Sequence, residues 1–487
     1  MDSPRASRNR HLEARPLPYS RVSPTAGRCL RAAVFVALAT ASAGRADEID
    51  DYIALQMSRQ HIPGLSLAVL QDGEPAKVRG YGVANLELGA AATPDTVYQI
   101  GSVSKQFIAA AVVILARDGK VGLDDSVGKY LGEAPETWQA ITLRHLLTHT
   151  SGLERETPGL QLTAQSDVDV IRAGFSAPLA FAPGEKWKYS NLGYSVLAEI
   201  ITRAAQMPWA QYVQEQIFTP LGMHATRTTT SEELVAQRAS GYHWMDSGTF
   251  HNALVVPGVR PSGAFLSTVV DLAKWDAALG SDRLLSPQER ELLWTRVKLK
   301  DGSEKPYGFG WEIGKAGTHR QVRHAGTMFG FRSQIVRFLD DRLTIVVLTN
   351  ATQSMPEKIA AGVAGFYLPD LKRPPTARPA ATVPDEVLDG YVGRYELPGG
   401  RVLTVTRREK NLAVSLPLQG LGQEIDSRLQ GVSMEIAWLT PEDATRFFDA
   451  DDPRSTYIFS TDAEGRMQFV IQDQKGKQNQ PARKQGS

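Results

Sequence analysis

The stretch Tyr98-Gln-Ile-Gly-Ser-Val-Ser-Lys-Gln-Phe107 places a serine and a lysine three residues apart, directly before the uncharged run 107–116. Ten uncharged residues without alternation predict a helix that is apolar on every side, and such a helix lies in the middle of a protein. Gly119 ends the run as a plausible C-cap. Because positions i and i+3 share one helix face, Ser102 and Lys105 are expected to touch.

This position is unfavourable for the charge of the lysine. A cation in the first turn opposes the helix dipole, and burial disfavours the ammonium further. Both effects favour the neutral amine of Lys105, and a neutral amine beside the Ser102 hydroxyl is a base next to a nucleophile. The plain alternative is a capping serine followed by a surface lysine, because S-x-x-K alone often occurs by chance. Ser104 is the rival serine, but its i+3 neighbour Phe107 offers no base.

Strand patterns stand at both ends of the first 370 residues, and helical patches such as 194–203 lie between them. The N-terminal strands 64–70 and 78–83 form a hairpin around Gln71-Asp-Gly73. The later strands are predicted at 309–313, 331–338 and 343–349. This order predicts an α+β fold in which the two ends join into one antiparallel sheet flanked by helices.

A second domain is predicted after residues 371–384, which carry four prolines and are typical of a semi-rigid linker. Beyond them, in 385–487, short strands recur with turns between, and such a pattern favours a small antiparallel β-barrel. We expect its aromatic residues to fill the interior rather than to line a ligand cavity. The expected strands are 390–395, 402–406, 412–415 and the hairpin 457–459 with 467–471.

The first 46 residues resemble a cleaved signal peptide. Seven arginines precede the apolar run 32–43, which is too short to span a bilayer and so predicts no stable membrane anchor. Residues 1–46 hold eight basic and two acidic residues, so 46 basic and 51 acidic residues remain, a net charge of about −5. This charge excludes a nucleic-acid footprint. The only cysteine, Cys29, leaves with the signal, and we expect a periplasmic or secreted protein.

Two further motifs favour the catalytic interpretation of Ser102 and Lys105 over the plain alternative. Tyr189-Ser-Asn191 stands just before a predicted helix, and Arg323-His-Ala-Gly-Thr-Met-Phe-Gly330 opens a predicted strand. With these motifs the chain resembles the serine β-lactamase and penicillin-binding protein superfamily, most closely the class C β-lactamase-like esterases and peptidases, over roughly residues 50–370. The tail resembles a lipocalin-like domain, through Tyr391-Val-Gly-Arg-Tyr-Glu396 and the terminal hairpin. Further matching phrases are 121–131, 141–153, 261–267 and 307–311.

The resemblance implies a role for each motif residue. Ser102 is the acylated nucleophile, and Lys105 keeps its hydroxyl activated. Tyr189 shares the general-base role, provided that a neighbouring cation, for which Lys105 is the candidate, lowers its pKa from about 10. Asn191 holds a carbonyl or amide of the substrate and contacts Lys105. The backbone N–H groups of Ser102 and Thr327 form the oxyanion hole.

The third motif departs from the pattern of the drug-binding relatives. His324-Ala-Gly326 stands where those relatives have Lys-Thr-Gly, so His324, Gly326 and Thr327 are expected on the substrate side. Histidine is mostly neutral above a pKa of about 6.5, whereas lysine gives a permanent cation for a carboxylate. This difference favours esters, amides or small peptides over β-lactams. The structural alternative for His324 is a histidine at a strand start that is bonded to the backbone.

The sequence therefore predicts an exported serine hydrolase that works through an acyl-enzyme and needs no cofactor or metal. Two alternatives stay open, namely a class C-type β-lactamase or peptidoglycan-acting D,D-peptidase, and an inactive scaffold whose tail binds. The pair His145 and His149 has zinc-helix spacing but lacks the glutamate of a metalloprotease. The expected partner is a small-molecule or peptide substrate, and its selection is expected from loops within 154–180 and 225–260. The oligomeric state is left open.

Overall fold

The computed structural model describes residues 48–157, 166–230, 232–254, 260–371, 378–418, 429–452, 454–473 and 475–486. The predicted signal peptide lies outside these residues, as do parts of the linker and of both predicted specificity loops. Within the described ranges, no helix is long and apolar enough to cross a membrane.

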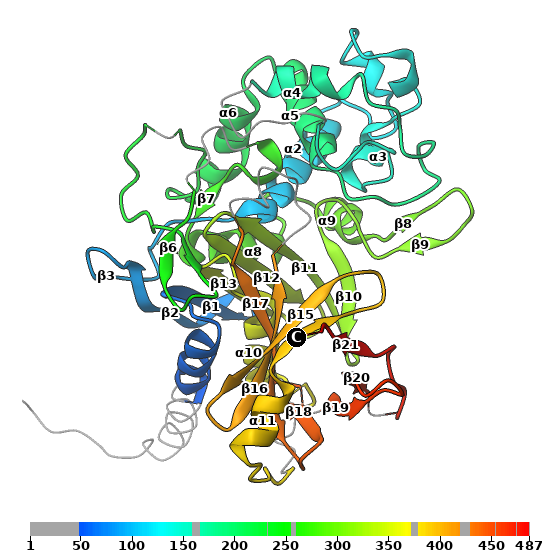
Figure 1. Cartoon of the computed structure of the whole chain (residues 1–487). Coiled ribbons are helices and arrows are strands. Elements are labelled where there is room, and N and C mark those ends of the chain that lie inside the picture. Colours follow the sequence, from blue (N-terminus) through cyan, green and yellow to red (C-terminus); the bar gives the residue numbers. More distant parts are fainter. Residues whose placement is uncertain are drawn as a thin grey trace, which may run out of the picture. The chain divides into compact units, whose positions relative to one another are not determined.

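The central element is a seven-stranded antiparallel sheet whose strand order is β10-β11-β12-β13-β1-β2-β3 (Figure 1). The strand β1 pairs along its length with β13, so the two ends of the predicted hydrolase region do join in one sheet. The hairpin predicted around residues 71–73 is confirmed, and residues 339–342 connect the antiparallel strands 331–338 and 343–349. The strands are β1 (Gly64–Gln71), β2 (Glu74–Asn85), β3 (Ala90–Ala91), β10 (Glu312–Ala316), β11 (His319–Met328), β12 (Phe331–Phe338) and β13 (Leu343–Thr349).

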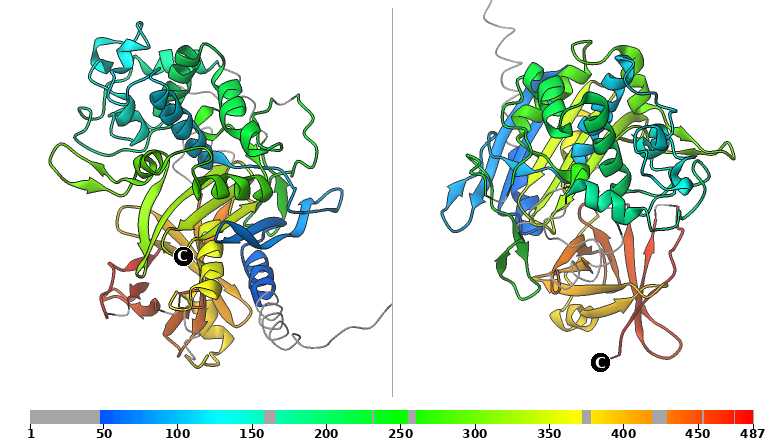
Figure 2. Two further views of the ribbon diagram at one scale, coloured as in Figure 1. Left: turned by 180° about the vertical axis from the view of Figure 1, so that it is seen from behind. Right: turned by 90° about the horizontal axis from the view of Figure 1, so that it is seen from above.

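Both faces of this sheet are covered, which explains why the central strands β1 and β13 are mainly apolar without alternation. On β13, Ile345 and Val347 belong to one apolar cluster, while Val346 and Leu348 belong to another. The first cluster packs against a helix over residues 48–59 and against α10 (Pro356–Tyr367). The second packs against α8 (Val269–Leu279) and the helical layer above it (Figure 2).

The helical layer is built around α2 (Lys105–Arg117), whose residues 105–115 are all buried. This confirms the central helix that the sequence predicts. A helix that is apolar on every side needs neighbouring elements on every side. The amphipathic segment 194–203 lies in α5 (Asn191–Ala205), which packs on α2. The other helices are α3 (Leu143–Leu147), α4 (Asp167–Gly174), α6 (Trp209–Val213), α7 (Thr219–Leu221) and α9 (Pro287–Trp294), with short helical turns at Gly101–Ser104, Val127–Lys129, Glu136–Trp138, Gln214–Phe218 and Pro261–Gly263.

In the hydrolase region one predicted strand needs correction, and short strands occur where mainly helices were expected. Residues 309–311 are not in the predicted strand 309–313, because Gly310 has a φ of +76° and packs against the start of α2, where a side chain would meet the Lys105 carbonyl. Three two-stranded sheets also interrupt the mainly helical region. They are formed by β4 (Tyr98–Gln99) with β7 (Leu266–Ser267), β5 (Tyr242–Trp244) with β6 (Phe250–Asn252), and β8 (Val297–Lys298) with β9 (Glu304–Lys305).

The C-terminal region is a closed eight-stranded antiparallel barrel, as the repeated short strands predict. Its interior holds packed aromatic rings, among them Tyr395, Phe459 and Phe469, so core packing is the use of these residues. The predicted strand 390–395 starts late, because 385–391 form a helix. The elements are α11 (Asp385–Tyr391), β14 (Gly393–Glu396), β15 (Val402–Arg408), β16 (Asn411–Pro417), β17 (Ser433–Pro441), β18 (Arg446–Asp449), β19 (Thr456–Thr461), β20 (Met467–Gln472) and β21 (Ala482–Lys484).

Candidate active site

The predicted contact between Ser102 and Lys105 is present. Ser102 lies in the 3-10 turn Gly101–Ser104, and Lys105 is the first residue of α2, so the two side chains leave the same face one turn apart. Lys105 Nζ lies 3.1 Å from Ser102 Oγ. The lysine is fully buried, whereas Ser102 remains partly exposed. The residue that carries the hydroxyl, Ser102, is therefore partly accessible to solvent, whereas the Lys105 amine that contacts it is not.

Two carbonyl oxygens complete the surroundings of this amine. Asn191 Oδ1 lies 2.8 Å from Lys105 Nζ, and the backbone carbonyl of Ser262 lies 2.9 Å from it. The orientation of the Asn191 amide is fixed, because its Nδ2 donates to Glu156 Oε1. Ser262 lies in the turn Pro261–Gly263, and Asn191 is the first residue of α5.

This arrangement suits either protonation state of Lys105. In a neutral amine, the two N–H groups donate to the Asn191 and Ser262 carbonyls, which accept only, and the lone pair faces Ser102 Oγ–H. Once the amine has taken the Ser102 proton, all three N–H groups have acceptors at the same heavy-atom positions. Proton transfer between the hydroxyl and the amine thus needs no rearrangement of the site.

Burial favours the neutral amine in the resting site. It holds the pKa of Lys105 well below its usual value of 10.5, while the nearby Glu156 charge raises the pKa and Arg155 lowers it. The direction predicted from the sequence is confirmed. The rings of Tyr189 and Tyr194 lie 4.8 and 5.3 Å from Lys105 Nζ, so the amine has aromatic faces beside it rather than water.

Two glycines bring the nucleophile turn close to β11. A methyl group on Gly101, which has a φ of +51°, would lie 2.7 Å from the Thr327 backbone nitrogen. A methyl group on Gly326 would lie only 2.0 Å from the Ile100 carbonyl oxygen. Side chains at either position would force the two backbones apart. Gly326 is therefore a spacing residue, and it lets Thr327 stand beside the segment that carries Ser102.

Tyr189 lies beside this pair, but its acidity differs from the expectation. Its hydroxyl is hydrogen-bonded to Ser102, yet burial raises the pKa of Tyr189 above its usual value, and the Ser102 bond and Arg155 only partly oppose this. The expectation that Lys105 lowers this pKa is wrong, because a buried neutral amine supplies no cation. Tyr189 is a neutral phenol in the resting site.

His149 supports Tyr189 from below, a role that the sequence did not reveal. Its ring Nδ1 accepts the Ser190 N–H, and its carbonyl accepts the Lys188 N–H, so both peptide neighbours of Tyr189 are held. The His149 and Tyr189 ring centroids lie 4.3 Å apart. His145, four residues before it, accepts the Thr142 N–H and caps α3.

The histidine of the third motif is hydrogen-bonded within the protein through both ring nitrogens. His324 is 2% exposed; its Nδ1 donates to the Ala325 carbonyl at 2.7 Å, and its Nε2 accepts from the Tyr307 hydroxyl at 2.9 Å. Burial lowers the pKa of His324 to about 3. The ring is neutral and has no free nitrogen. The geometry therefore does not support His324 as a substrate anchor, and it matches the backbone-bonded alternative.

The structure separates the two candidate serines. Ser104 is fully buried and its Oγ accepts the Phe265 N–H at 3.1 Å, so its hydroxyl holds a loop. Sequence reasoning missed Ser262, Glu156 and Tyr307 as members of the site. Ser262 and Tyr307 stand inside family-like phrases, which was the only signal, and Ser262 acts through a backbone carbonyl that no side-chain pattern reveals.

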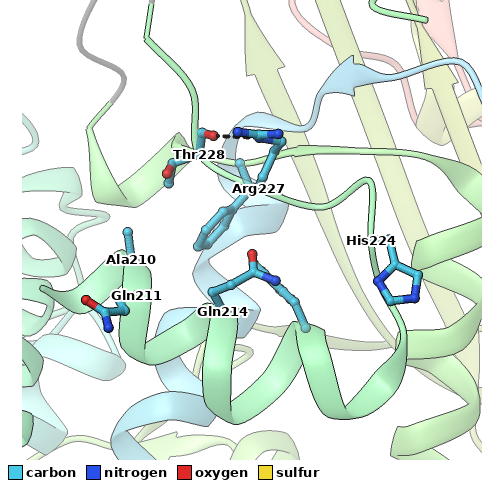
Figure 3. Close-up of a pocket in the computed structure, with 8 residues that line it drawn as sticks. Ala210, Gln211, Gln214, His224, Arg227 and Thr228 are labelled. Atoms are coloured by element: carbon cyan, nitrogen blue, oxygen red, sulfur yellow. Dashed lines mark hydrogen bonds between the residues drawn. The ribbon is translucent and has the colours of Figure 1, made fainter. Parts of the chain in front are cut away.

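Two of the hollows in the described part of the molecule differ in their relation to this site. The smaller, of about 220 Å³, is bordered by Tyr189 and Tyr307. The larger, of about 420 Å³, shares no lining residue with the site. Figure 3 shows it between the helical segment that carries Gln211 and Gln214 and the facing loop residues Arg227 and Thr228. The smaller hollow is therefore the one connected to the chemistry.

A family model described as "Beta-lactamase" matches residues 49–366. The chain belongs to the beta-lactamase family. The match spans the seven-stranded sheet and the helical layer, and it includes Ser102, Lys105, Tyr189, Asn191 and His324. A serine-hydrolase fold of the β-lactamase and penicillin-binding protein superfamily is thus shown, whereas the barrel lies beyond the matched residues.

The chain is also similar in sequence to named proteins. It is 28% identical to penicillin-binding protein 4* of Bacillus subtilis over 385 residues, which cover 73% of this chain and 85% of that protein. It is 26% identical to protein flp of Staphylococcus aureus over 325 residues, 64% of each chain.

Solved structures show the same fold. An octameric penicillin-binding protein homologue from Pyrococcus abyssi matches with a TM-score of 0.64 at 23% identity, covering 88% of this chain and 96% of that one. D-amino acid amidase from Ochrobactrum anthropi, complexed with D-phenylalanine, matches with a TM-score of 0.56 at 23% identity, covering 68% of this chain and 97% of that one.

Proposed function

We propose that this protein is an exported serine hydrolase that cleaves an ester, an amide or a small peptide through an acyl-enzyme on Ser102. One observation carries the proposal. The buried Lys105 amine has both of its hydrogens directed to carbonyl acceptors, and its third direction faces the accessible Ser102 hydroxyl. Membership of the beta-lactamase family supports it.

The acylation step follows from these contacts. The Ser102 Oγ–H proton passes to Lys105 Nζ while Oγ forms a bond to the substrate carbonyl carbon. The backbone N–H groups of Ser102 and Thr327 receive the developing oxyanion, and a donor of this kind contributes roughly 2.7–4 kcal/mol. The bond between the carbonyl carbon and the leaving oxygen or nitrogen then breaks. Water later attacks the acyl carbon while the neutral Lys105 amine takes its proton; the bond between that carbon and Ser102 Oγ then breaks, and Lys105 returns the proton to Oγ.

Tyr189 serves the leaving group in this scheme. Because its pKa is raised, it does not stand as a phenolate base; its neutral hydroxyl donates a proton to the leaving oxygen or nitrogen. The proton taken up by Lys105 then restores the neutral tyrosine. The roles of base and proton donor are therefore divided between Lys105 and Tyr189.

A covalent label tests the proposal. Incubation with a fluorophosphonate, followed by peptide mapping, is expected to place the label on Ser102. The variant Ser102→Ala is expected to lose both the label and ester hydrolysis, while the control Ser104→Ala keeps both. Labelling that persists in Ser102→Ala would contradict the proposal. Absence of label in the folded wild type would favour an inactive scaffold with a binding tail.

Penicillin binding or β-lactam hydrolysis is a second candidate, favoured by the name of the Bacillus relative. The neutral, fully bonded His324 argues against it, because that ring offers no cation to a β-lactam carboxylate. We expect acylation by benzylpenicillin and turnover of nitrocefin to be slow beside ester hydrolysis. Nitrocefin turnover that equals or exceeds the turnover of simple esters would reverse this order.

Export rests on the N-terminal sequence. Sequencing the N-terminus of protein from the culture medium or periplasm is expected to find a start near Asp47. A protein that keeps residues 1–46 would contradict the signal peptide.

A further inference from the structure

The hollow of about 220 Å³ beside Tyr189 has no assigned use. Its aromatic wall is formed by Trp187, Tyr189 and Tyr307, and Pro306 and Ile313 add apolar surface. Trp187 is 37% exposed, so part of this large apolar side chain is open to solvent. Its ring centroid lies 5.9 Å from that of Tyr307 and 6.5 Å from that of Tyr189. The wall is therefore an aromatic slot that stays open to solvent.

The position of the slot assigns it to one end of the substrate. Tyr189 is both a wall of the slot and the proposed proton donor to the leaving group. Asn191, Ser262 and Thr327, which surround the amine and the proposed oxyanion hole, do not line it. A group that enters the slot thus extends from the atom that Tyr189 protonates, not from the acyl carbon.

The size and charge of the slot restrict that group. A cavity of about 150 Å³ can hold a benzene ring, so this hollow accepts one ring-sized group. Arg323 and Glu312 form an ion pair on the wall with a distance of 3.0 Å, and Lys305 also lines it. Two cations and one carboxylate leave an excess of positive charge, which disfavours a cationic leaving group and favours an acidic one.

We propose that this slot binds the leaving group, and that the enzyme prefers esters and amides whose leaving alcohol or amine carries a ring-sized apolar group, neutral or acidic. This inference rests on the proposed acyl-enzyme function. Trp187 is its main specificity-determining residue, because it supplies the exposed aromatic wall. Arg323 sets the preference for charge.

Paired substrates test the assignment. Phenyl acetate and trifluoroethyl acetate share the acyl group and differ in the leaving group. Trp187→Ala is expected to lower kcat/KM about tenfold or more for phenyl acetate and less than about twofold for trifluoroethyl acetate. Each substrate is compared with itself in the wild type, so intrinsic reactivity cancels. The matched control Trp244→Ala removes a tryptophan outside the slot and is expected to change neither value.

The deacylation rate distinguishes binding of the leaving group from binding of the acyl group. Both substrates give the same acetyl-enzyme, from which the leaving group has gone, so the deacylation rate constant of Trp187→Ala is expected to equal that of the wild type. The preference between phenyl acetate and phenyl butyrate is also expected to stay unchanged. An altered deacylation rate, an altered acyl preference, or equal losses for both acetates would overturn the assignment.

The charge preference has its own readout. Arg323→Gln is expected to lower kcat/KM for 4-acetoxybenzoate, whose leaving group carries a carboxylate, by about tenfold relative to phenyl acetate. Equal effects on the two substrates would overturn this part. Fluorophosphonate labelling of Ser102 in the same variants distinguishes the two levels: a label with unchanged selectivity rejects the slot alone, and no label on wild-type Ser102 rejects the hydrolase as well.

Discussion

Two polar clusters at the candidate site are each built around a buried base, and they handle protons in opposite ways. The amine cluster consists of Ser102, Lys105, Asn191 and the Ser262 carbonyl, and the histidine cluster consists of Tyr307, His324 and the Ala325 carbonyl. In the amine cluster every bond remains possible after a proton has moved. In the histidine cluster each ring nitrogen already has one partner of fixed direction.

This difference separates the groups that can transfer protons from the groups that support the structure. A buried base needs acceptors for each proton it gains, and only the amine cluster supplies them. Protonated His324 would have an N–H directed at the Tyr307 oxygen, so the Tyr307 hydroxyl would have to turn its own proton away from the ring. We therefore assign proton transfer to the amine cluster and strand support to the histidine cluster.

The largest effect is expected from removing the amine. Lys105→Met keeps an apolar stem and is expected to lower kcat/KM by about 10³-fold or more, because the nucleophile loses its base. The folded protein should survive, since a buried amine costs free energy. Steady-state kinetics and a thermal melt measure both. The control Lys129→Met changes an exposed lysine, and a comparable loss there would remove the contrast.

Tyr189→Phe is expected to lower kcat/KM by about 10²-fold, and the size of this loss should depend on the leaving group. Poor leaving groups such as alkoxides and amines need the proton, whereas a nitrophenolate does not. The loss of kcat/KM should thus be greater for an amide than for the matched nitrophenyl ester. Equal losses for the two substrates would contradict the role of Tyr189 as proton donor.

His324→Asn should act mainly on stability. The neutral form of this histidine stabilises the fold fully above the unfolded pKa of about 6.5, and this contribution is lost as pH falls toward the folded pKa of about 3. At pH 5 the wild type loses about 2 kcal/mol through this group. Urea unfolding at pH 7.5 and pH 5 is expected to show a smaller loss in the variant.

Two readouts accompany that experiment. The control His251→Asn, at an exposed position, is expected to keep the full wild-type loss. kcat/KM at pH 8 is expected to stay within about tenfold of the wild type in His324→Asn, because the ring offers no nitrogen to substrate. A loss as large as that of Lys105→Met would place the histidine cluster in the chemistry.

The smallest effect is expected from Glu156→Gln. The glutamine carbonyl can still accept from Asn191, but the negative charge that raises the pKa of Lys105 is gone. The acid limb of the pH profile of kcat/KM, below which Lys105 is protonated, should therefore move to lower pH. The neighbouring control Glu154→Gln removes a carboxylate paired with Lys188 and should leave the limb in place. A limb that moves upward would contradict the charge argument.

Much of this organisation follows from the sequence, for identifiable reasons. The strands 331–338 and 343–349 and the helix around 107–116 were predicted because apolar runs of those lengths allow few other structures. The Ser102–Lys105 contact followed from helical spacing alone. Partners contributed by distant segments could not be predicted, because the Ser262 carbonyl and the Tyr307 hydroxyl reach the site only through the packing of η5 (Pro261–Gly263) and of the segment before β10.

The pKa of Tyr189 shows where sequence reasoning failed. The sequence placed a lysine near this tyrosine, and a charged lysine would have lowered the pKa. Burial, which depends on the whole fold, neutralises that lysine and raises the pKa of the tyrosine as well. The sign of an electrostatic effect was therefore set by packing that no local motif encodes.

The central claim is that the Lys105 amine is neutral in the resting enzyme. Protein labelled with lysine carrying ¹³C at Cε gives one NMR resonance that is absent from Lys105→Met, and its chemical shift can be followed with pH. We expect this resonance to have the shift of a neutral amine at pH 8 and to titrate well below the usual lysine pKa of 10.5. A resonance that keeps the ammonium shift up to pH 10 would contradict it.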